Sequence, residues 1–297
     1  MTVQTIIFSK DRPLQLHATL ASFALHASDA SEVPISILVR ASSNAYAIGY
    51  DQVAQEFASQ LQIQWIKESQ FKNDLLSVIQ VNRSASRLGR LLHRLLLRKP
   101  RLRSDHLLFM VDDNLFVRSF CLQQVVDMLD SCPDAIGFSL RVGRNTTSCY
   151  SMQCEQPLPQ FESLSPGLRF QWAGQVGDFG YPLEVSSSVY RVADLIPLLR
   201  ALPYSNPNRL EQGLASATGL FARRMPVLLC FEQSVAFCAP VNKVQSVLDN
   251  RSGAQAEYSS ETLNTLFLDG YRINVSALRE FVPGAAHVEI ELPLCRS

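Results

Sequence analysis

The chain has 297 residues, with 27 basic and 27 acidic side chains and therefore no formal net charge. This balance gives no support for binding nucleic acid or a membrane through a charged surface. Hydrophobic residues make up 47% of the chain, which is enough to bury a sizeable core. We expect no integral membrane segment, because no long uninterrupted apolar stretch occurs. Since the N-terminus lacks the pattern of a signal peptide, we also expect a cytoplasmic protein.

The first half of the chain alternates between strand and helix patterns. Short apolar runs predict strands at residues 4–9, 34–39, 62–66 and 106–111. Helical patterns lie between them at residues 14–26, 50–61 and 74–97, and Pro13 suits the first turn of the first helix. This alternation predicts an α/β fold with a mostly parallel sheet and helices on both sides. In such sheets, ligands bind beyond the carboxyl ends of the strands.

The second half of the chain is less regular. Strand patterns occur at residues 135–142, 179–190, 227–231 and 234–238, and helical patterns at 192–202 and from 206 onward. We find no repeat, no low-complexity segment and no clear linker in the sequence. The sequence therefore predicts a single domain over residues 1–297.

Acidic and amide side chains follow the apolar run at residues 106–111, in the order Asp112, Asp113 and Asn114. Partly buried carboxylates are costly when unpaired, and Mg²⁺ or Mn²⁺ would offset that cost. Alternate residues of extended backbone face the same side, so we expect Asp112 and Asn114 to hold one ion. Such an ion would stabilise a diphosphate as a leaving group, with Asp113 facing a ribose hydroxyl or a backbone N–H. The alternative is an acidic turn that caps the next segment.

Polar residues also follow the first two predicted strands. Ser9, Lys10, Asp11 and Arg12 come after the first, and Arg40 comes after the second. Because the carboxyl ends of parallel strands lie at one edge of a sheet, we expect these residues to share a crevice with the acidic segment.

Two of these segments carry a family resemblance. The sequence IIFSKDRPLQL from Ile6 to Leu16 is similar to the first strand and turn of glycosyltransferases with the GT-A fold, especially family-2-like members. The sequence FMVDDN from Phe109 to Asn114 resembles their DxD motif. The resemblance implies a GT-A-like (Rossmann-like) mixed sheet, a UDP- or GDP-sugar donor, Mn²⁺ or Mg²⁺, and transfer to a hydroxyl of a small molecule or glycan. It also implies that residues 1–145 bind the nucleotide-sugar and that residues 146–297 face the acceptor.

Carried over by position, the resemblance assigns roles to several residues. The segment from Ser9 to Arg12 would line the nucleotide, together with Arg40 and Asp113. Asp112 and Asn114 match the ends of the DxD motif, although an amide oxygen is a weaker metal ligand than a carboxylate.

Two residues late in the chain are further candidates at the metal and the diphosphate. His287 would be a third metal ligand, unless it is a solvent-facing histidine on a terminal strand. Lys243 would place positive charge near the leaving phosphates, and Asn242 competes with His287 for contact with the metal or the diphosphate.

Transfer to a hydroxyl requires a carboxylate that takes the proton of the attacking oxygen. Glu211 and Asp178 are the candidates, because each lies in a polar, turn-like segment of the second half. Glu211 has a structural alternative, since Asn208 stands three residues before it as in a capping box. Asp178 has the alternative of an ordinary turn residue. The Glu-Asp pair of family-2 enzymes is reduced here to Glu211 followed by Gln212, which leaves the stereochemical outcome open.

Two other functions remain alternatives. A sugar nucleotidyltransferase usually has a glycine-rich loop after the first strand, and residues 9–14 contain no glycine. A catalytically weak or inactive nucleotide-sugar-binding protein of the same fold is compatible with Asn114 and Gln212 at their positions.

Overall fold

A computed structural model describes residues 3–79, 104–242 and 258–296. The helix predicted over residues 74–97 begins as α3 (Phe71–Ile79), and the rest of that range lies outside the described residues. Lys243 also lies outside them. In the part of the chain that the structure describes, no helix is both long and apolar enough to cross a membrane.

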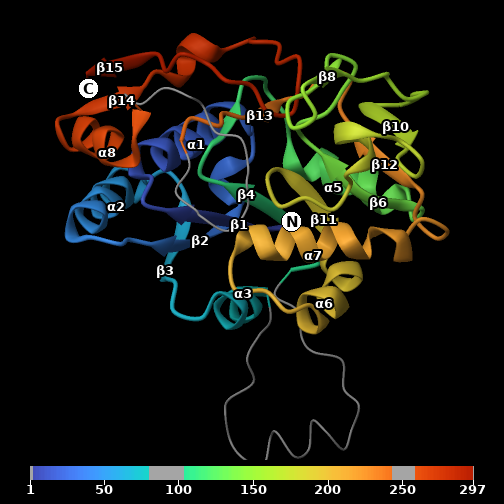
Figure 1. Cartoon of the computed structure of the whole chain (residues 1–297), viewed down its shortest axis with the longest axis horizontal. Helices are drawn as coiled ribbons and strands as arrows, with labels where there is room; N and C mark the ends of the chain where they lie inside the picture. The colour runs from blue at the N-terminus through green and yellow to red at the C-terminus, as the bar shows by residue number, and fades with distance from the viewer. Residues whose placement is uncertain (1–2, 80–103, 243–257, 297) are drawn as a thin grey trace, which may run out of the picture.

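A nine-stranded mixed sheet forms the centre of the molecule (Figure 1). Its order is β3-β2-β1-β4-β11-β6-β12-β10-β9, and only β10 and β11 run against the other strands. The strands are β1 (Val3–Lys10), β2 (Pro34–Arg40), β3 (Gln62–Lys67), β4 (His106–Val111), β6 (Ala135–Ser139), β9 (Glu162–Leu164), β10 (Gly167–Gln171), β11 (Ser188–Arg191) and β12 (Val227–Cys230). The predicted α/β class, with a mixed and mostly parallel sheet, is confirmed.

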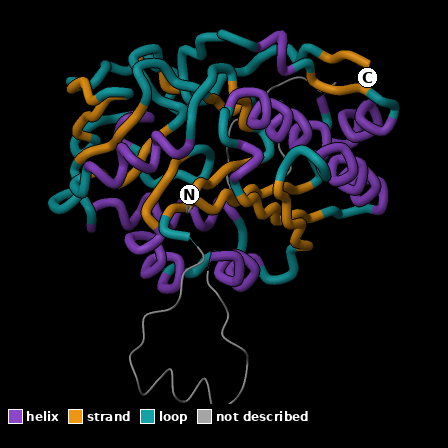
Figure 2. The backbone as a smooth tube through the Cα atoms, turned by 180° about the vertical axis from the view of Figure 1, so that it is seen from behind, coloured by secondary structure: helices purple, strands orange, loops and turns teal. Residues whose placement is uncertain are grey.

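Helices cover both faces of the sheet (Figure 2). One face carries α1 (Pro13–His26), α2 (Asn44–Phe57), α5 (Leu122–Ser131) and α8 (Ser260–Leu268), and the other carries α3, α6 (Val192–Ala201) and α7 (Pro207–Ala217). Central strands therefore bury side chains on both sides: Ile7 and Met110 pack in one core, and Ile6 and Phe109 in the other. This two-sided burial explains the near-continuous apolar runs in the sequence.

Three two-stranded ribbons lie outside the central sheet. They pair β5 (Asn114–Phe116) with β13 (Ala236–Cys238), β7 (Ser148–Cys149) with β8 (Cys154–Glu155), and β14 (Tyr271–Ile273) with β15 (Leu294–Arg296). The strand predicted over residues 179–190 is wrong for most of its length, since only β11 forms there. Side chains replace the strand ladder in this segment, as where the Glu184 N–H donates to the Tyr190 hydroxyl at 2.9 Å.

Candidate functional site

The carboxyl ends of β1 and β4 lie side by side at the centre of the sheet. The two strands pair in parallel up to Phe8 and Val111, so the segments after them meet. The Lys10 N–H donates to Asp112 Oδ2 at 3.2 Å, and the Thr19 hydroxyl on α1 donates to the Asp112 carbonyl at 2.9 Å. The segments that follow these two strand ends therefore contact each other.

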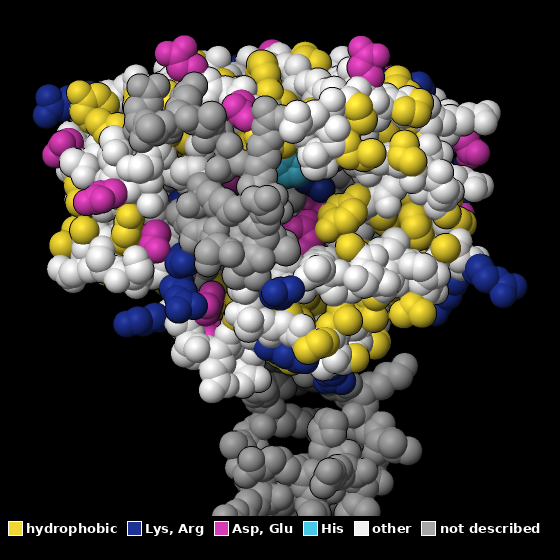
Figure 3. All heavy atoms as spheres, in the orientation of Figure 1, with side chains coloured by type: hydrophobic (Ala, Val, Ile, Leu, Met, Phe, Trp, Pro, Cys, Tyr) yellow, Lys and Arg dark blue, Asp and Glu magenta, His cyan; other side chains and the backbone are white. Residues whose placement is uncertain are grey.

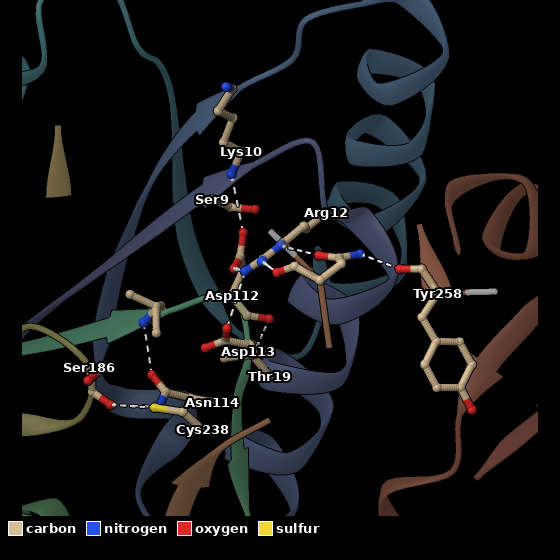
Figure 4. A network of polar contacts seen from close by, with 12 residues as sticks. Ser9, Lys10, Arg12, Thr19, Asp112, Asp113, Asn114, Ser186, Cys238 and Tyr258 are labelled. Carbon is tan, nitrogen blue, oxygen red and sulfur yellow. Dashed lines mark hydrogen bonds and ion pairs between the residues drawn. The ribbon is translucent and has the colours of Figure 1, made fainter. Parts of the chain in front are cut away.

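Arg12 joins the two acidic side chains of this edge (Figure 4). Its Nη1 lies 3.0 Å from Asp112 Oδ1 and 3.2 Å from Asp113 Oδ2. Its Nε donates to Asn242 Oδ1 at 2.9 Å, and its Nη2 donates to the Asn242 carbonyl. Asn242 in turn donates to the Tyr258 carbonyl at 2.8 Å, so Arg12 links the strand edge to the chain after β13.

The charges at this edge do not cancel. Burial lowers the pKa of Arg12, but Asp112 and Asp113 outweigh it and raise that pKa, so the guanidinium stays charged. Burial raises the pKa of Asp113 to about 6, against the opposing effect of Arg12 and with a further contribution from Asp112. Two carboxylates thus share one guanidinium, and one negative charge is left over.

Asn114 points away from the two acids and into the core (Figure 4). Its Oδ1 accepts from the Val111 N–H at 2.8 Å, and its Nδ2 donates to the Ser186 carbonyl at 2.6 Å. The chain turns at Asp112 and Asp113, so the alternation of extended backbone does not apply there. Asp112 and Asn114 therefore do not face the same side. Asp112 and Asp113 do, since both contact Arg12 Nη1.

Tyr50 on α2 holds the turn after β1 in place. Its hydroxyl lies 2.7 Å from Ser9 Oγ and accepts from the Arg12 N–H at 3.1 Å. The preceding Gly49 allows this approach, since a Cβ there would lie 2.7 Å from Pro13 Cγ. Sequence analysis missed Tyr50, because nothing local relates it to the residues after β1.

The other predicted nucleotide-lining residues differ in their surroundings. Asp11 has a left-handed φ of 55°, which Asp tolerates better than most residues, and its Oδ1 accepts from the Ser42 N–H at 2.7 Å. It therefore ties together the loops after β1 and β2. Arg40 is 62% exposed in its side chain and lies 3.5 Å from Glu68, so it belongs to the outer surface of this edge.

A second charged group lies on the other side of the site, around the buried Arg141. Its Nε is 3.7 Å from Glu184 Oε2, and both side chains are almost completely buried. Burial lowers the pKa of Arg141, but Glu184, Asp178 and Glu211 together outweigh it and raise that pKa. Sequence analysis missed Arg141 and Glu184, which come from distant loops with no shared motif.

Glu211 lies in this group and not at a helix cap. The N-cap of α7 is Asn206, whose side chain accepts from the Arg209 N–H at 2.9 Å. The alternative of a capping box between Asn208 and Glu211 is therefore wrong, because α7 begins at Pro207 and Asn208 lies inside its first turn. Burial raises the pKa of Glu211 to about 7, Arg141 opposes the rise, and Glu184 and Asp113 add to it. Glu211 thus lies within electrostatic reach of both arginine-centred groups.

Asp178 and His287 flank Arg141. Asp178 lies in the 3-10 helix Gly177–Gly180, where Gln156 Nε2 donates to its Oδ2 at 3.2 Å, and burial raises its pKa. His287 Nε2 is 3.5 Å from Arg141 Nη1, and burial and that guanidinium lower the pKa of His287 to about 3. The space-filling view shows histidine, basic and acidic side chains together in a recess on one face of the molecule (Figure 3).

The predicted metal ligands are not gathered around one point. Among residues 3–79, 104–242 and 258–296, no group of three or more His, Cys, Asp or Glu side chains is arranged to hold an ion. Asn114 is directed into the core, and His287 lies beside the Arg141 guanidinium. The Asp112–Asp113 pair remains as the acidic group that would suit a cation.

Comparisons with known proteins find one sequence relative and several structures of similar fold. No family model matches the chain. A bifunctional glycosyltransferase, pgtA of Dictyostelium discoideum, is 23% identical in an alignment of length 275 that covers 84% of this chain and 33% of the relative. The chain therefore spans about a third of the length of that relative.

One solved structure shows the same fold, and a second superposes slightly less well. S. aureus TarS 1-349 in complex with UDP superposes with a TM-score of 0.51 at 12% identity, covering 81% of this chain and 61% of that one. TarS 1-349 in complex with UDP-GlcNAc gives a TM-score of 0.49 at 11% identity and covers 90% and 66% of the two chains. The resemblance to glycosyltransferases with the GT-A fold, inferred from residues 6–16 and 109–114, is confirmed at the level of the fold.

Proposed function

We propose that this chain is a glycosyltransferase that moves a sugar from a nucleotide-diphosphate sugar to an acceptor hydroxyl. One observation carries the proposal: two acidic groups from the two halves of the chain, Asp113 and Glu211, interact electrostatically, since Asp113 raises the pKa of Glu211. Each acid also interacts with an arginine: Asp113 lies 3.2 Å from Arg12 Nη1, and Arg141 opposes the rise in the pKa of Glu211. The fold shared with UDP-bound TarS and the similarity to the Dictyostelium glycosyltransferase support it.

In the proposed reaction, the donor lies over the turn after β1, with its diphosphate at the Asp112–Asp113 pair. Glu211 takes the proton of the acceptor hydroxyl as its oxygen attacks the anomeric carbon, and the bond from that carbon to the diphosphate breaks. A carboxylate whose pKa is about 7 is suited to this task, because it is both ionised and basic near neutral pH. Asp178 and Glu184 hold Arg141 beside Glu211, which makes them positioning residues.

A divalent cation, Mn²⁺ or Mg²⁺, fits the proposed donor site. Asp112 and Asp113 share the single charge of Arg12, which leaves them with negative charge to spare. Mg²⁺ is commonly held by one or two carboxylates and completed by substrate phosphates, so a cage of three protein ligands is not needed. Bound there, the ion would neutralise charge on the leaving diphosphate. Asn114 and His287 are left out of the proposed ligand set.

Donor binding and hydrolysis without acceptor test the proposal. We expect UDP or GDP with Mn²⁺ to raise the free energy of unfolding by about 2.7 kcal/mol at a hundredfold excess over Kd. We also expect slow hydrolysis of at least one UDP- or GDP-sugar, which releases the nucleotide. Asp113→Asn should abolish this hydrolysis. Asp51→Asn, on the exposed surface of α2, should leave it unchanged. Binding without release, across a broad acceptor screen, would instead identify a nucleotide-sugar-binding protein.

A further inference from the structure

A cavity opens beside the proposed catalytic group, between the β7–β8 hairpin and the segment 284–289. Its volume is about 520 Å³, and Tyr150, Glu155, His287 and Glu289 are among the residues that line it. Pockets for small ligands typically measure about 300–1,000 Å³, so one or two sugar rings can be accommodated.

The hairpin and the opposite wall are tied together. The N–H groups of Thr147 and Ser148 both donate to the Gly284 carbonyl at 3.0 Å, and Ser148 Oγ donates to the same oxygen at 3.1 Å. The Tyr150 hydroxyl donates to Glu289 across the cavity. These bonds fix both walls, so the cavity is largely formed before any ligand enters.

The cavity adjoins the proposed reacting groups. His287 belongs to its lining and lies 3.5 Å from Arg141, which is electrostatically coupled to Glu211. Gln156 follows β8 directly and donates to Asp178. One lining side chain, His287, therefore connects the cavity to Arg141 of the proposed catalytic group.

The chemistry of the lining selects among acceptors. Its charged side chains are Glu155 and Glu289, and the residues that line it include no Lys or Arg. His287 stays neutral at physiological pH because its pKa is lowered. An ionised carboxylate only accepts hydrogen bonds, so a bound ligand must offer donors such as sugar hydroxyls. A phosphate or uronate would bring like charge and further acceptors instead.

The cavity also offers an aromatic surface. The Tyr150 ring is half-buried in the wall, and its centroid lies 6.1 Å from that of His287 at an interplanar angle of 30°. Aromatic rings combine an apolar face with a polar edge, which suits the mixed surface of a sugar.

We propose that this cavity is the acceptor subsite and that it takes an uncharged glycosyl unit, bound through Tyr150, Glu155 and Glu289. The assignment rests on the proposed function, because it names the substrate class of the same site.

The test measures binding without turnover. Saturation-transfer NMR in the presence of UDP would compare the methyl glycosides of glucose, galactose and mannose with the matched methyl glucuronide and galacturonide. We expect at least one neutral glycoside to bind, and its uronide to bind about tenfold more weakly or worse.

Tyr150→Ala and Glu289→Gln should each weaken binding of the neutral glycoside, and Glu289→Lys should reduce the discrimination against the uronide. Asp51→Lys on α2 makes the same change in net charge away from the cavity and should alter neither.

Equal binding of neutral and acidic glycosides would overturn the assignment, as would no binding of any probe. An unchanged neutral signal in both Tyr150→Ala and Glu289→Gln would overturn it as well. None of these results affects donor hydrolysis without acceptor, so a failure here is distinguishable from a failure of the proposed function.

Discussion

The two charged groups of the site are built on the same principle but from different parts of the chain. On the donor side, Arg12 lies between Asp112 and Asp113 at the ends of adjacent parallel strands. On the acceptor side, Arg141 forms an ion pair with Glu184. Asp178 and Glu211, from a 3-10 helix and from α7, also raise its pKa. In both groups one buried guanidinium serves more than one carboxylate.

The comparison shows where reactive acids arise in this protein. Asp113 and Glu211 each belong to a group in which the carboxylates outnumber the arginine. Burial raises the pKa of both acids. Asp113 also contributes to the raised pKa of Glu211, because both side chains carry negative charge. On each side the carboxylates thus outnumber the guanidinium groups, which leaves negative charge in the site.

The largest effect is expected at Glu211. Glu211→Gln keeps the size of the side chain but removes the base, so kcat should fall by about 10²–10⁴-fold. In the unaltered protein, activity should rise with pH through a midpoint near 7, since the base must be ionised. Steady-state rates of the unaltered protein and of Glu211→Gln from pH 5 to 9 would check both expectations. If Asp178→Asn leaves the loss of activity at low pH unchanged, Glu211 and not Asp178 is the base.

Glu211→Gln is expected to lower activity but to raise the stability of the fold at high pH. The folded-state pKa of Glu211 is raised from 4.5 to about 7, so its protonated form stabilises the fold at low pH and this contribution is lost as pH rises through 7. Glu211→Gln should therefore raise the free energy of unfolding at pH 8 by about 1–3 kcal/mol, with no gain at pH 4. A loss of stability at pH 8 would contradict the assignment of Glu211 as an uncompensated acid.

The next largest effect is expected at the Arg141–Glu184 pair. Arg141→Met leaves Glu184 buried without its partner, which should cost about 3–5 kcal/mol in the free energy of unfolding. Adding Glu184→Gln should recover much of this loss, because the uncompensated charge is then removed. Urea unfolding of the single and double variants would measure it, and additive losses would show that the two side chains act independently.

The smallest effect is expected at Asn114, which we do not place among the metal ligands. Asn114→Asp removes the donor to the Ser186 carbonyl, so we expect a loss of about 1–3 kcal/mol in the free energy of unfolding. Mn²⁺-dependent UDP binding, measured by calorimetry, should not become tighter. Tighter binding in this variant would restore Asn114 to the ligand set.

The donor edge could be predicted from the sequence because its information is local. Apolar runs located β1 and β4, and parallel strands bring their ends together, so Asp112 was placed beside the turn that contains Arg12. The direction of Asn114 could not be predicted, because it depends on a turn that the assumption of extended backbone excluded.

The acceptor side could not be assembled in this way. Arg141 and Glu184 are separated by loops of irregular structure, and their contact depends on how β11 inserts between β4 and β6. Glu211 was a candidate because it lies in a polar, turn-like segment of the sequence, but its pKa depends on groups that only the tertiary structure brings near. Burial of charge is a property of the whole fold and leaves no local pattern.

Gly49 has a consequence well outside the helix that contains it. A methyl group there would collide with the proline that starts α1 and with the Asn264 amide of α8, each at 2.7 Å. Since Tyr50 follows at once, any shift of α2 would carry its hydroxyl away from Ser9 and from the Arg12 N–H. Variation at position 49 should therefore be poorly tolerated and should register first as weaker nucleotide binding, although no donor atom would ever touch that residue.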